Sequence, residues 1–340
     1  MIKTIKSVRS FLFIVCLIIS GCASKTESSA DQWVIYDGYD GPGKGKHIVF
    51  VTGDEEYRSE EAMPQMAKIL AKRHGFKCTV LFSIDPKTGA IDPEKLDNIP
   101  GLDALGTADL MFLFTRFREL PDDQMKHIID YTNSGKPIIG LRTATHAFNY
   151  IENTDGPYAK YSFNDKEFEG GYGRQILGET WVAHYGHHGK ESSRGIVAEG
   201  KENHPIVKGC EDIWGPTDVY EVGELTGNSE PIIMGQVLTG MNPDDPPKSD
   251  KPLMPMAWIK DYDGDTGNTT KVFTTTMGAA TDLESEGLRR LLVNATYWSL
   301  GMENQIPDRA NVDVVGTFNP TPFGFGDHIK GVMPASHKIK

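Results

Sequence analysis

The chain has 340 residues, of which 39% are hydrophobic and 24% are charged. This composition is typical of a folded globular protein and excludes a largely disordered or fibrous chain. The formal net charge is −12. Because nucleic-acid binding needs a basic surface and no lysine- and arginine-rich run occurs, a nucleic-acid partner is not expected.

The N-terminus carries the features of a bacterial export signal. Lys3, Lys6 and Arg9 are followed by the apolar run 11–19. A run this short cannot cross about 30 Å of hydrocarbon at about 1.5 Å per residue, so we interpret it as the apolar part of a signal peptide. A short membrane anchor is the alternative.

Residues 19–22 (ISGC) resemble a bacterial lipobox. The resemblance implies a lipoprotein signal peptide over 1–21, cleavage before Cys22 and attachment of lipid to its sulfur. An ordinary signal peptide followed by an incidental cysteine is the alternative. Acyl chains suffice to anchor such a protein. By resemblance to enterobacterial lipoprotein sorting rules, Ala23 in place of an aspartate after Cys22 implies the outer membrane. We therefore predict a protein anchored to a bacterial membrane by its lipid, facing the periplasm.

Apolar runs and amphipathic stretches then alternate along the first half of the chain. A polar tether and glycine-rich lead-in loop over 22–46 come first. Ser59 is the expected N-cap of the first helix and Gly75 its stop. The strands and helices alternate with polar turns, which predicts a parallel sheet wrapped by helices in an α/β fold. Strands are expected at 47–53, 78–84, 109–115 and 137–141, and helices at 60–74 and 121–135.

The second half of the chain mixes short strands with irregular segments. We find no internal repeat and no break in composition, so we predict one domain over 47–301 and an extended tail over 302–340 packed on it. Cys78 lies within a strand and is expected to be a small buried apolar residue rather than half of a disulfide with Cys210. Further strands and a last helix are expected at 232–238, 254–259, 271–277 and 284–300.

Polar side chains follow four of the predicted strands at the point where each strand ends. Because ligands of open α/β sheets bind at the carboxyl ends of the strands, we expect these side chains to share one site. Glu55 and Glu56, after the first strand, are candidate catalytic carboxylates. The candidate substrate-binding residues are Asp54, Tyr57, Arg116, Arg142, Thr143, His146 and Asp282.

The segment 181–194 contains His184, His187 and His188. We treat these three as candidate catalytic acids or bases, because imidazole exchanges protons near neutral pH. Together with His146 they are also candidate ligands of a divalent transition metal, the one cofactor that the sequence suggests. Their spacing matches no known zinc signature. Contact with a polar ligand, or bonds to the backbone, are therefore alternatives.

The turn after the fourth strand invites comparison with a nucleophile elbow, but Arg142 stands at its apex instead of serine or cysteine. A guanidinium has no usable lone pair and is not a nucleophile. Thr143 has no obvious activating base beside it in the sequence. Arg142 is better suited to hold a carboxylate, a phosphate or an enediolate-like oxygen.

Several segments, in this order, resemble the ThuA-like (trehalose-utilisation) family of the class I glutamine amidotransferase-like superfamily. They are VFVTGDEEYRSEE, PIIGLRTATHAF, HYGHHG, HPIVKG, MPMAW and KVFTTTMG, all within 47–301. The resemblance implies a flavodoxin-like, doubly wound, mostly parallel sheet with helices on both faces. It also implies a link with disaccharide catabolism, including routes through 3-keto sugars.

Two departures from the superfamily pattern concern the reaction. Amidotransferases carry a cysteine at the elbow position, where this chain has Arg142, and many ThuA-like members follow the last strand with Gly-His, where this chain has Gly278 and Ala279. Glutaminase activity is therefore not expected.

The leading hypothesis is a lipoprotein enzyme that acts on a small-molecule carbohydrate, a sugar or keto-sugar, in a cleft at the carboxyl edge of the sheet. Hydrolase, lyase and isomerase reactions are all compatible with it. The second hypothesis is a non-catalytic carbohydrate-binding protein on the same fold, suggested by the missing nucleophile. A structural scaffold at the membrane is the third, suggested by the lipid and the long tail.

Overall fold

The computed structural model describes residues 32–339. The predicted signal peptide, the lipidation site Cys22 and most of the predicted tether lie outside the described residues. Within 32–339, none of the helices combines the length and the apolar character that crossing a membrane requires.

A ten-stranded sheet forms the centre of the molecule, with the strand order β1-β3-β2-β4-β5-β12-β11-β10-β7-β8. A separate two-stranded ribbon pairs β6 (Ala183–His184) with β9 (Tyr220–Glu221). The three long helices are α1 (Ser59–His74), α2 (Asp122–Thr132) and α3 (Glu286–Ser299). The strands of the large sheet are β1 (Trp33–Tyr36), β2 (His47–Gly53), β3 (Lys77–Leu81), β4 (Leu110–Thr115), β5 (Ile138–Leu141), β7 (Ser193–Val197), β8 (Ile213–Gly215), β10 (Glu230–Val237), β11 (Met254–Asp263) and β12 (Thr269–Thr275).

The α/β class predicted from the sequence is confirmed, but the sheet is mixed rather than mostly parallel. β3, β2, β4, β5 and β12 are parallel neighbours. β1 at one edge and β11, β10, β7 and β8 at the other are antiparallel to their neighbours. The reason lies in the connections: β11 and β12 are joined by a tight turn, and a hairpin can only make antiparallel strands.

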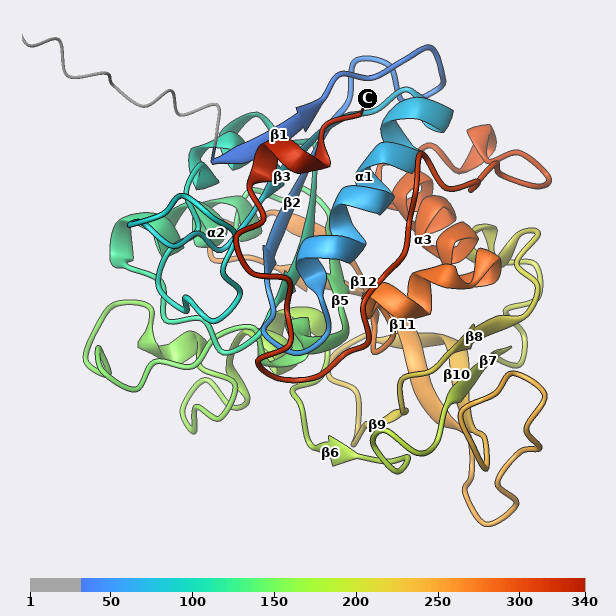
Figure 1. Cartoon of the computed structure of the whole chain (residues 1–340). Helices are drawn as coiled ribbons and strands as arrows, with labels where there is room; N and C mark the ends of the chain where they lie inside the picture. The colour runs from blue at the N-terminus through green and yellow to red at the C-terminus, as the bar shows by residue number, and fades with distance from the viewer. Residues whose placement is uncertain (1–31, 340) are drawn as a thin grey trace, which may run out of the picture.

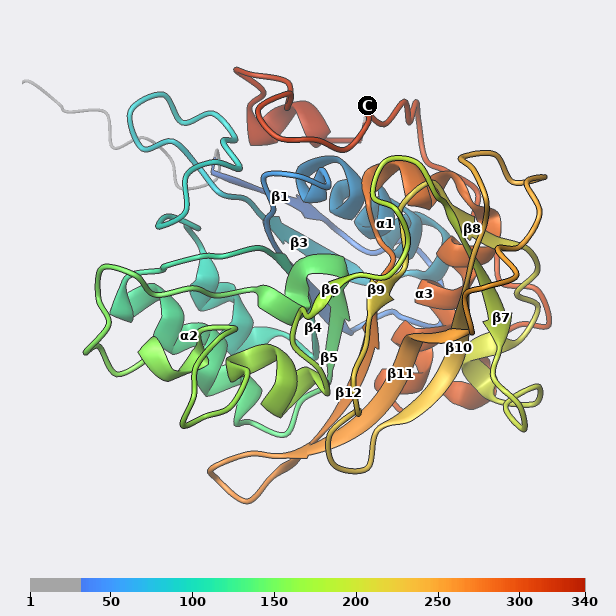
Figure 2. The same ribbon diagram turned by 90° about the horizontal axis from the view of Figure 1, so that it is seen from below.

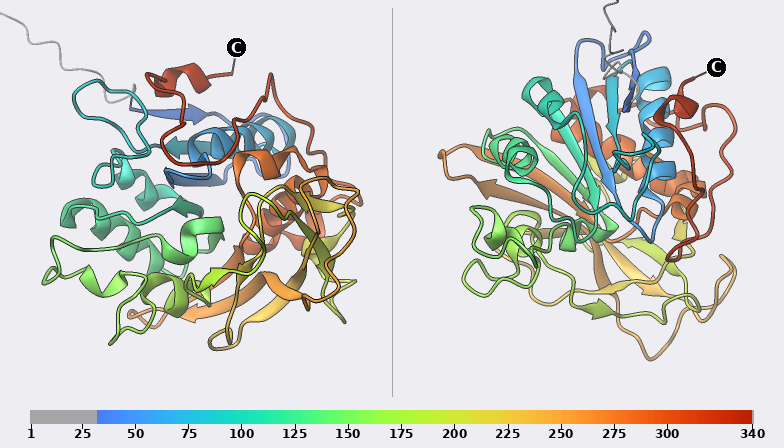
Figure 3. Two further views of the ribbon diagram at one scale, coloured as in Figure 1. Left: turned by 60° about the horizontal axis from the view of Figure 1, so that its bottom comes forward. Right: turned by 60° about the vertical axis from the view of Figure 1, so that its left-hand side comes forward.

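Side chains of the central strands alternate between two apolar layers. Ile48 and Phe50 of β2 pack into the layer that contains α1 and α3. Val49 and Val51 pack into the layer that contains α2. Figures 2 and 3 show these helices on opposite faces of the sheet. A strand covered on both faces needs apolar side chains at every position, which explains the continuous apolar runs of the central strands.

Of the two predicted ends of the first helix, the stop at Gly75 is confirmed and the N-cap at Ser59 is wrong. Gly75 ends α1 in the left-handed conformation at φ 84°, as predicted. Ser59 is not the N-cap, because the helix begins at Ser59 and Arg58 occupies the cap position without a capping side-chain bond. The Ser59 hydroxyl instead accepts hydrogen bonds from the backbone N–H groups of Gly53 and Asp54, each at 3.1 Å. It therefore fixes the turn after β2.

The tail after α3 packs on the domain and loops around α1, with one arm on each side of that helix (Figure 1). Val312 and Val315 are buried in the layer of α1 and α3. At the bend, Thr321 is held by the Glu61 carboxylate, and near the end the Tyr36 hydroxyl donates to the His337 carbonyl at 2.7 Å.

Both described cysteines are unpaired. Cys78 is buried within β3, as the sequence analysis expected, and Cys210 is partly buried near α3.

Candidate functional site

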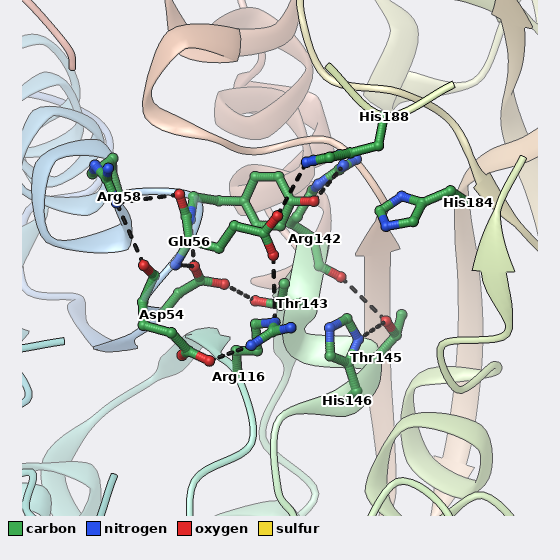
Figure 4. A network of polar contacts seen from close by, with 12 residues as sticks. Asp54, Glu56, Arg58, Arg116, Arg142, Thr143, Thr145, His146, His184 and His188 are labelled. Carbon is green, nitrogen blue, oxygen red and sulfur yellow. Dashed lines mark hydrogen bonds and ion pairs between the residues drawn. The ribbon is translucent and has the colours of Figure 1, made fainter. Parts of the chain in front are cut away.

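The carboxyl ends of the parallel strands β2, β4, β5 and β12 lie at one edge of the sheet, and the polar segments that follow them meet there (Figure 4). This is the gathering that the sequence predicted. The histidine segment 184–188 joins it through the β6–β9 ribbon, which pairs His184 with Tyr220.

Asp54 fixes the turn from β2 into α1. Its carboxylate accepts from the backbone N–H groups of Glu56 and Tyr57 and from the Thr143 hydroxyl. Burial, together with the charge of Glu55, raises the pKa of Asp54 to about 6, against the opposing effect of these hydrogen bonds. Asp54 and Thr143 are both buried and bonded to each other, so they join two strand ends rather than contact a ligand.

Glu55 is held by two arginines that follow β4. One carboxylate oxygen pairs with Arg116 and the other lies 2.6 Å from Arg118 Nη2. Arg118 is fully buried and also donates to the carbonyls of Pro93 and Lys95. Glu55 is therefore anchored in a charge network, which argues for a positioning role rather than the catalytic role expected from the sequence.

Arg142 follows β5 in the left-handed region at φ 45°, which is strained for a residue with a side chain and gives the tight turn expected of an elbow. Its guanidinium lies between the rings of Tyr57 and Tyr220, 4.3 and 4.0 Å from their centroids. It donates to the carbonyls of Asp218 and Thr276 at 2.8 and 2.7 Å. The expectation that Arg142 holds a ligand oxygen is thus corrected, because the side chain is fully buried and its terminal nitrogens bond to the protein.

Asp218 connects Arg142 to the histidine segment. One oxygen, Oδ1, lies 3.0 Å from Arg142 Nη2 and 3.0 Å from His188 Nδ1. The other, Oδ2, lies 2.8 Å from His184 Nδ1. Burial opposes ionisation of this carboxyl, but Arg142 and the two histidines outweigh burial and hold its pKa well below the usual value. Asp218 is therefore an anion that orients both imidazoles.

His188 lies between two carboxylates. Its Nδ1 contacts Asp218, and its Nε2 lies 3.3 Å from Glu56 Oε1. These hydrogen bonds, opposed by partial burial, raise the pKa of His188 to about 9. The imidazole is therefore protonated at neutral pH and carries a fixed positive charge, and Glu56 is one of the two groups that keep it there.

His184 differs from His188 in having one ring nitrogen available. Nδ1 is bonded to Asp218, whereas Nε2 has no hydrogen-bond partner among residues 32–339. The side chain is 36% exposed, and its ring centroid lies 4.6 Å from that of His188. A carboxylate-oriented imidazole with a free and accessible nitrogen is the arrangement that general base catalysis uses.

Three further candidates make no hydrogen bond to Asp218, His184 or His188. His187 is exposed and bonds through its backbone: its N–H donates to the Glu191 carboxylate at 2.8 Å, and its carbonyl accepts from the N–H groups of Lys190 and Glu191. His146 is buried among aromatic rings, with Nδ1 3.1 Å from the Thr145 hydroxyl, and burial followed by nearby positive charges lowers its pKa well below the usual value. Asp282 is buried and accepts from Thr217 and from the backbone of 278–279. The expected catalytic role of His187 and the binding role of Asp282 are therefore corrected.

The same cluster contains the one group in residues 32–339 whose geometry suits a metal ion. Donor atoms of His184, His188 and Asp218 all lie within 4.8 Å of one another. Two of these residues are among the predicted ligands, whereas His187 and His146 do not join the group. Two imidazoles and a carboxylate suit zinc or a similar ion, but His188 would first have to lose its proton.

The tail supplies two aromatic side chains that the sequence analysis left without a role. The Phe323 ring lies 5.2 Å from the ring of His188 and 5.6 Å from that of Tyr57. Phe325 is 59% exposed and lies over the Arg116 guanidinium at 4.9 Å, with Phe117 over the same group at 4.4 Å. The tail thus forms one side of the site.

An open groove of about 650 Å³ is lined by Glu55 and Phe117 and extends along Glu119, Leu120 and Asn149; His184, His188 and Asp218 do not line it. Its size falls within the range of small-molecule sites, about 300–1,000 Å³.

Asp218 is the central residue that the sequence analysis missed. It lies in the segment GPTDVYE, which resembles no catalytic motif and follows no predicted strand. The sequence held only an indirect signal for Asp218. This aspartate lies between two short apolar stretches, and these are close enough along the chain to the histidine segment to pair with it in a β-ribbon.

Comparisons with known proteins give structural neighbours only. No family model matches the sequence, and no curated protein matches it. Among solved structures, the chain is similar to a protein named as ThuA-like from Bacteroides uniformis, with 14% identity and a TM-score of 0.47, over 78% of this chain and 95% of that one. A second, named in the same way, from Parabacteroides merdae, has 15% identity and a TM-score of 0.48, over 83% of this chain and 98% of that one.

Proposed function

We propose that this chain is a ThuA-like protein that acts on a sugar or keto-sugar at the carboxyl edge of its sheet. The observation that carries the proposal is the Asp218 carboxylate, which orients the imidazoles of His184 and His188. The ordered sequence motifs support the choice of substrate class. In this proposal the parallel strands β3, β2, β4, β5 and β12 form a flavodoxin-like core, whose usual strand order 2-1-3-4-5 they follow.

The chemistry proposed for the site is proton transfer beside a carbonyl group. His184 Nε2 removes a proton from a carbon or hydroxyl of the bound sugar, and Asp218 stabilises the imidazolium that forms. The positive charge of His188 stabilises the negative charge that develops on the sugar oxygen. Arg142 acts indirectly in this proposal, because its guanidinium holds Asp218 in place.

Covalent catalysis by a thiol has no support in the described residues. Cys78 and Cys210 lie away from the cluster, and burial raises the pKa of Cys210 to about 12. Proton transfer needs no nucleophilic side chain, so the proposed chemistry is compatible with Arg142 at the position where an elbow nucleophile would stand.

We further propose that the protein is exported and anchored by lipid on Cys22 to the outer membrane, where it faces the periplasm. The charged, apolar and ISGC segments of the N-terminus support this. A Cys22→Ala variant should leave the membrane fraction, whereas an unchanged distribution between membrane and soluble fractions would contradict the anchor.

The test of function is incubation of the purified protein with trehalose and with 3-keto derivatives of disaccharides, followed by product analysis and by calorimetry. Conversion that is lost in His184→Gln supports the proposal. Binding without conversion would favour the alternative, a carbohydrate-binding protein on the same fold.

The geometry of His184, His188 and Asp218 also supports a second candidate, a divalent metal site. Elemental analysis of the purified protein tests it directly. One equivalent of zinc or a similar ion, lost in His184→Gln, would assign the cluster to a metal. Protein without bound metal that still converts substrate would assign it to proton transfer.

A further inference from the structure

A surface pocket of about 410 Å³ lies between α1 and the two arms of the tail, which flank that helix in Figure 1. α1 contributes Lys68 and Lys72, which lie one helical turn apart and therefore on the same face of the helix. One arm of the tail contributes 315–317, and the other contributes Ser336, Lys338 and Ile339. The pocket thus brings together three ammonium groups from two segments that are far apart in the sequence.

The positive charges of this pocket have no counter-charge within the described chain. Among residues 32–339, no carboxylate lines the pocket. Other lysines, such as Lys126 and Lys208, pair with aspartates, whereas none of the three pocket lysines forms an ion pair within 32–339. The net charge of the whole chain is −12, so the pocket is a locally positive surface on an acidic protein.

Lys68 is the most informative of the three lysines because it is partly buried. Burial lowers the pKa of Lys68, and no carboxylate opposes this effect. Burial, followed by the positive charge of Lys68, lowers the pKa of the neighbouring His337 to about 4, so this imidazole is neutral at pH 7. A partly buried ammonium group without a counter-ion is costly, because burial removes water and supplies no opposite charge. A bound anion would supply that charge.

The donors around the pocket suit a phosphate group. A lysine ammonium group binds phosphate as a point charge with three N–H donors. Three such groups can contact separate oxygens of a doubly charged tetrahedral anion, whereas a carboxylate offers one charge and two oxygens. The Thr317 hydroxyl, which makes no hydrogen bond to residues 32–339, can donate to a further oxygen. Because the pocket is open to solvent, its volume does not limit the group that carries the phosphate.

We propose that Lys68, Lys72 and Lys338 bind a phosphate group in this pocket, carried either by a soluble phosphate ester or by a lipid headgroup. The three ammonium groups contact the phosphate oxygens, and the Thr317 hydroxyl donates to one of them. This binding site is separate from the histidine cluster and does not depend on the function proposed there.

The test is calorimetric titration of the purified full chain with inorganic phosphate and with glucose 6-phosphate, in a buffer without other multivalent anions. Phosphate should bind with a stoichiometry of one, and its affinity should fall as sodium chloride is added, because salt screens the attraction between charges. Lys68→Gln should weaken binding by about tenfold or more, because it removes a partly buried charged donor. Lys72→Gln and Lys338→Gln should each weaken binding by about threefold, because charges exposed to water contribute less.

Two controls locate the binding. Lys166→Gln, at an exposed lysine outside the pocket, should bind phosphate as the wild type does, and so should His184→Gln in the histidine cluster. The proposal is overturned if phosphate does not bind at millimolar concentration, or if Lys68→Gln and Lys72→Gln both bind as the wild type does. It is equally overturned if Lys166→Gln weakens binding as much as Lys68→Gln, because the loss of any positive charge would then explain the effect.

Vesicles identify the source of the phosphate group. The Cys22→Ala variant, which lacks the predicted site of lipid attachment, is mixed with phosphatidylcholine vesicles that do or do not contain phosphatidic acid. Sedimentation only with phosphatidic acid, lost when Lys68→Gln is added, supports a lipid headgroup as the ligand. Binding of the soluble phosphates without sedimentation supports a soluble phosphate ester. Sedimentation that persists unchanged with Lys68→Gln would overturn a headgroup site at this pocket.

Discussion

Arg142 and Asp218 form an ion pair in which neither side chain is exposed, with Nη2 and Oδ1 3.0 Å apart. The same carboxylate contacts His184 and His188, each of which is about one-third exposed. A buried arginine thus fixes a buried carboxylate, and the carboxylate orients two imidazoles. Arg142, in the tight turn after β5, therefore supports the orientation of both histidines through Asp218.

Loss of Arg142 should therefore destabilise the fold. Arg142→Ala leaves Asp218 buried without its main charge partner, which typically costs about 3–5 kcal/mol of unfolding free energy. Urea denaturation measures this cost. Arg309→Ala is the control, because Arg309 is 58% exposed in its pair with Glu286 and should contribute less than about 1 kcal/mol. Equal effects of the two substitutions would contradict the role given to Arg142.

The raised pKa of His188 predicts how stability depends on pH. The folded protein holds this proton with a pKa of about 9, whereas an unfolded histidine titrates near pH 6.5. The stabilisation is therefore fully present below about pH 6.5 and is lost as the pH rises through about 9. His188→Gln should remove this decline in the pH profile of the unfolding free energy. His187→Gln, at the exposed neighbour, should retain it, and a profile unchanged in His188→Gln would count against the bridge between Asp218 and Glu56.

Glu60 predicts a second pH effect in the layer between α1 and the tail. Its carboxyl has a pKa of about 8 in the folded protein because of burial, and near 4.3 when unfolded. Between these values only the unfolded state ionises, so stability falls as the pH rises, by at most about 1.4 kcal/mol per pH unit. Glu60→Gln should flatten the profile in this range and be the more stable protein at pH 8. A profile identical to that of Glu167→Gln, a control at an exposed glutamate, would show that Glu60 is ionised in the fold.

Phe325 of the tail is predicted to contact the bound sugar, because it is an exposed aromatic side chain stacked on Arg116 beside the groove. Phe325→Ala should raise KM by about tenfold and leave kcat and the unfolding free energy nearly unchanged, as expected when an aromatic contact worth roughly 1 kcal/mol or more is lost. Val314→Ala, at another exposed apolar residue of the tail, should change neither constant. An unchanged KM in Phe325→Ala would place the substrate elsewhere.

The central strands were predictable because their burial on both faces leaves a strong sequence signal. β2 has the predicted bounds 47–53, and β4 and β5 differ from prediction by one residue at the start. The antiparallel half was harder to predict. β7 and β8 are short and only partly apolar, and the direction of a strand is set by its connections rather than by its own residues.

The candidate site was predictable in its location but not in its central residue. The carboxyl-end rule brought together Asp54, Arg116 and Arg142, and the histidine segment was identified by its composition, whereas Asp218 follows no predicted strand. The role of each candidate residue depends on how deeply its side chain is buried. The sequence does not reveal that Arg142 would be enclosed by two tyrosines, nor that His187 would point to solvent while its neighbour His188 faces two carboxylates.

The most direct measurement is the turnover of a 3-keto disaccharide by the wild type and by His184→Gln, with unfolding curves of both proteins recorded in parallel. The wild type should form product, and His184→Gln should lower kcat by about 100-fold or more at unchanged stability, the loss expected when a general base is removed. His187→Gln should match the wild type. Turnover by His184→Gln at the wild-type rate would contradict the assignment of proton transfer to the Asp218–His184 pair.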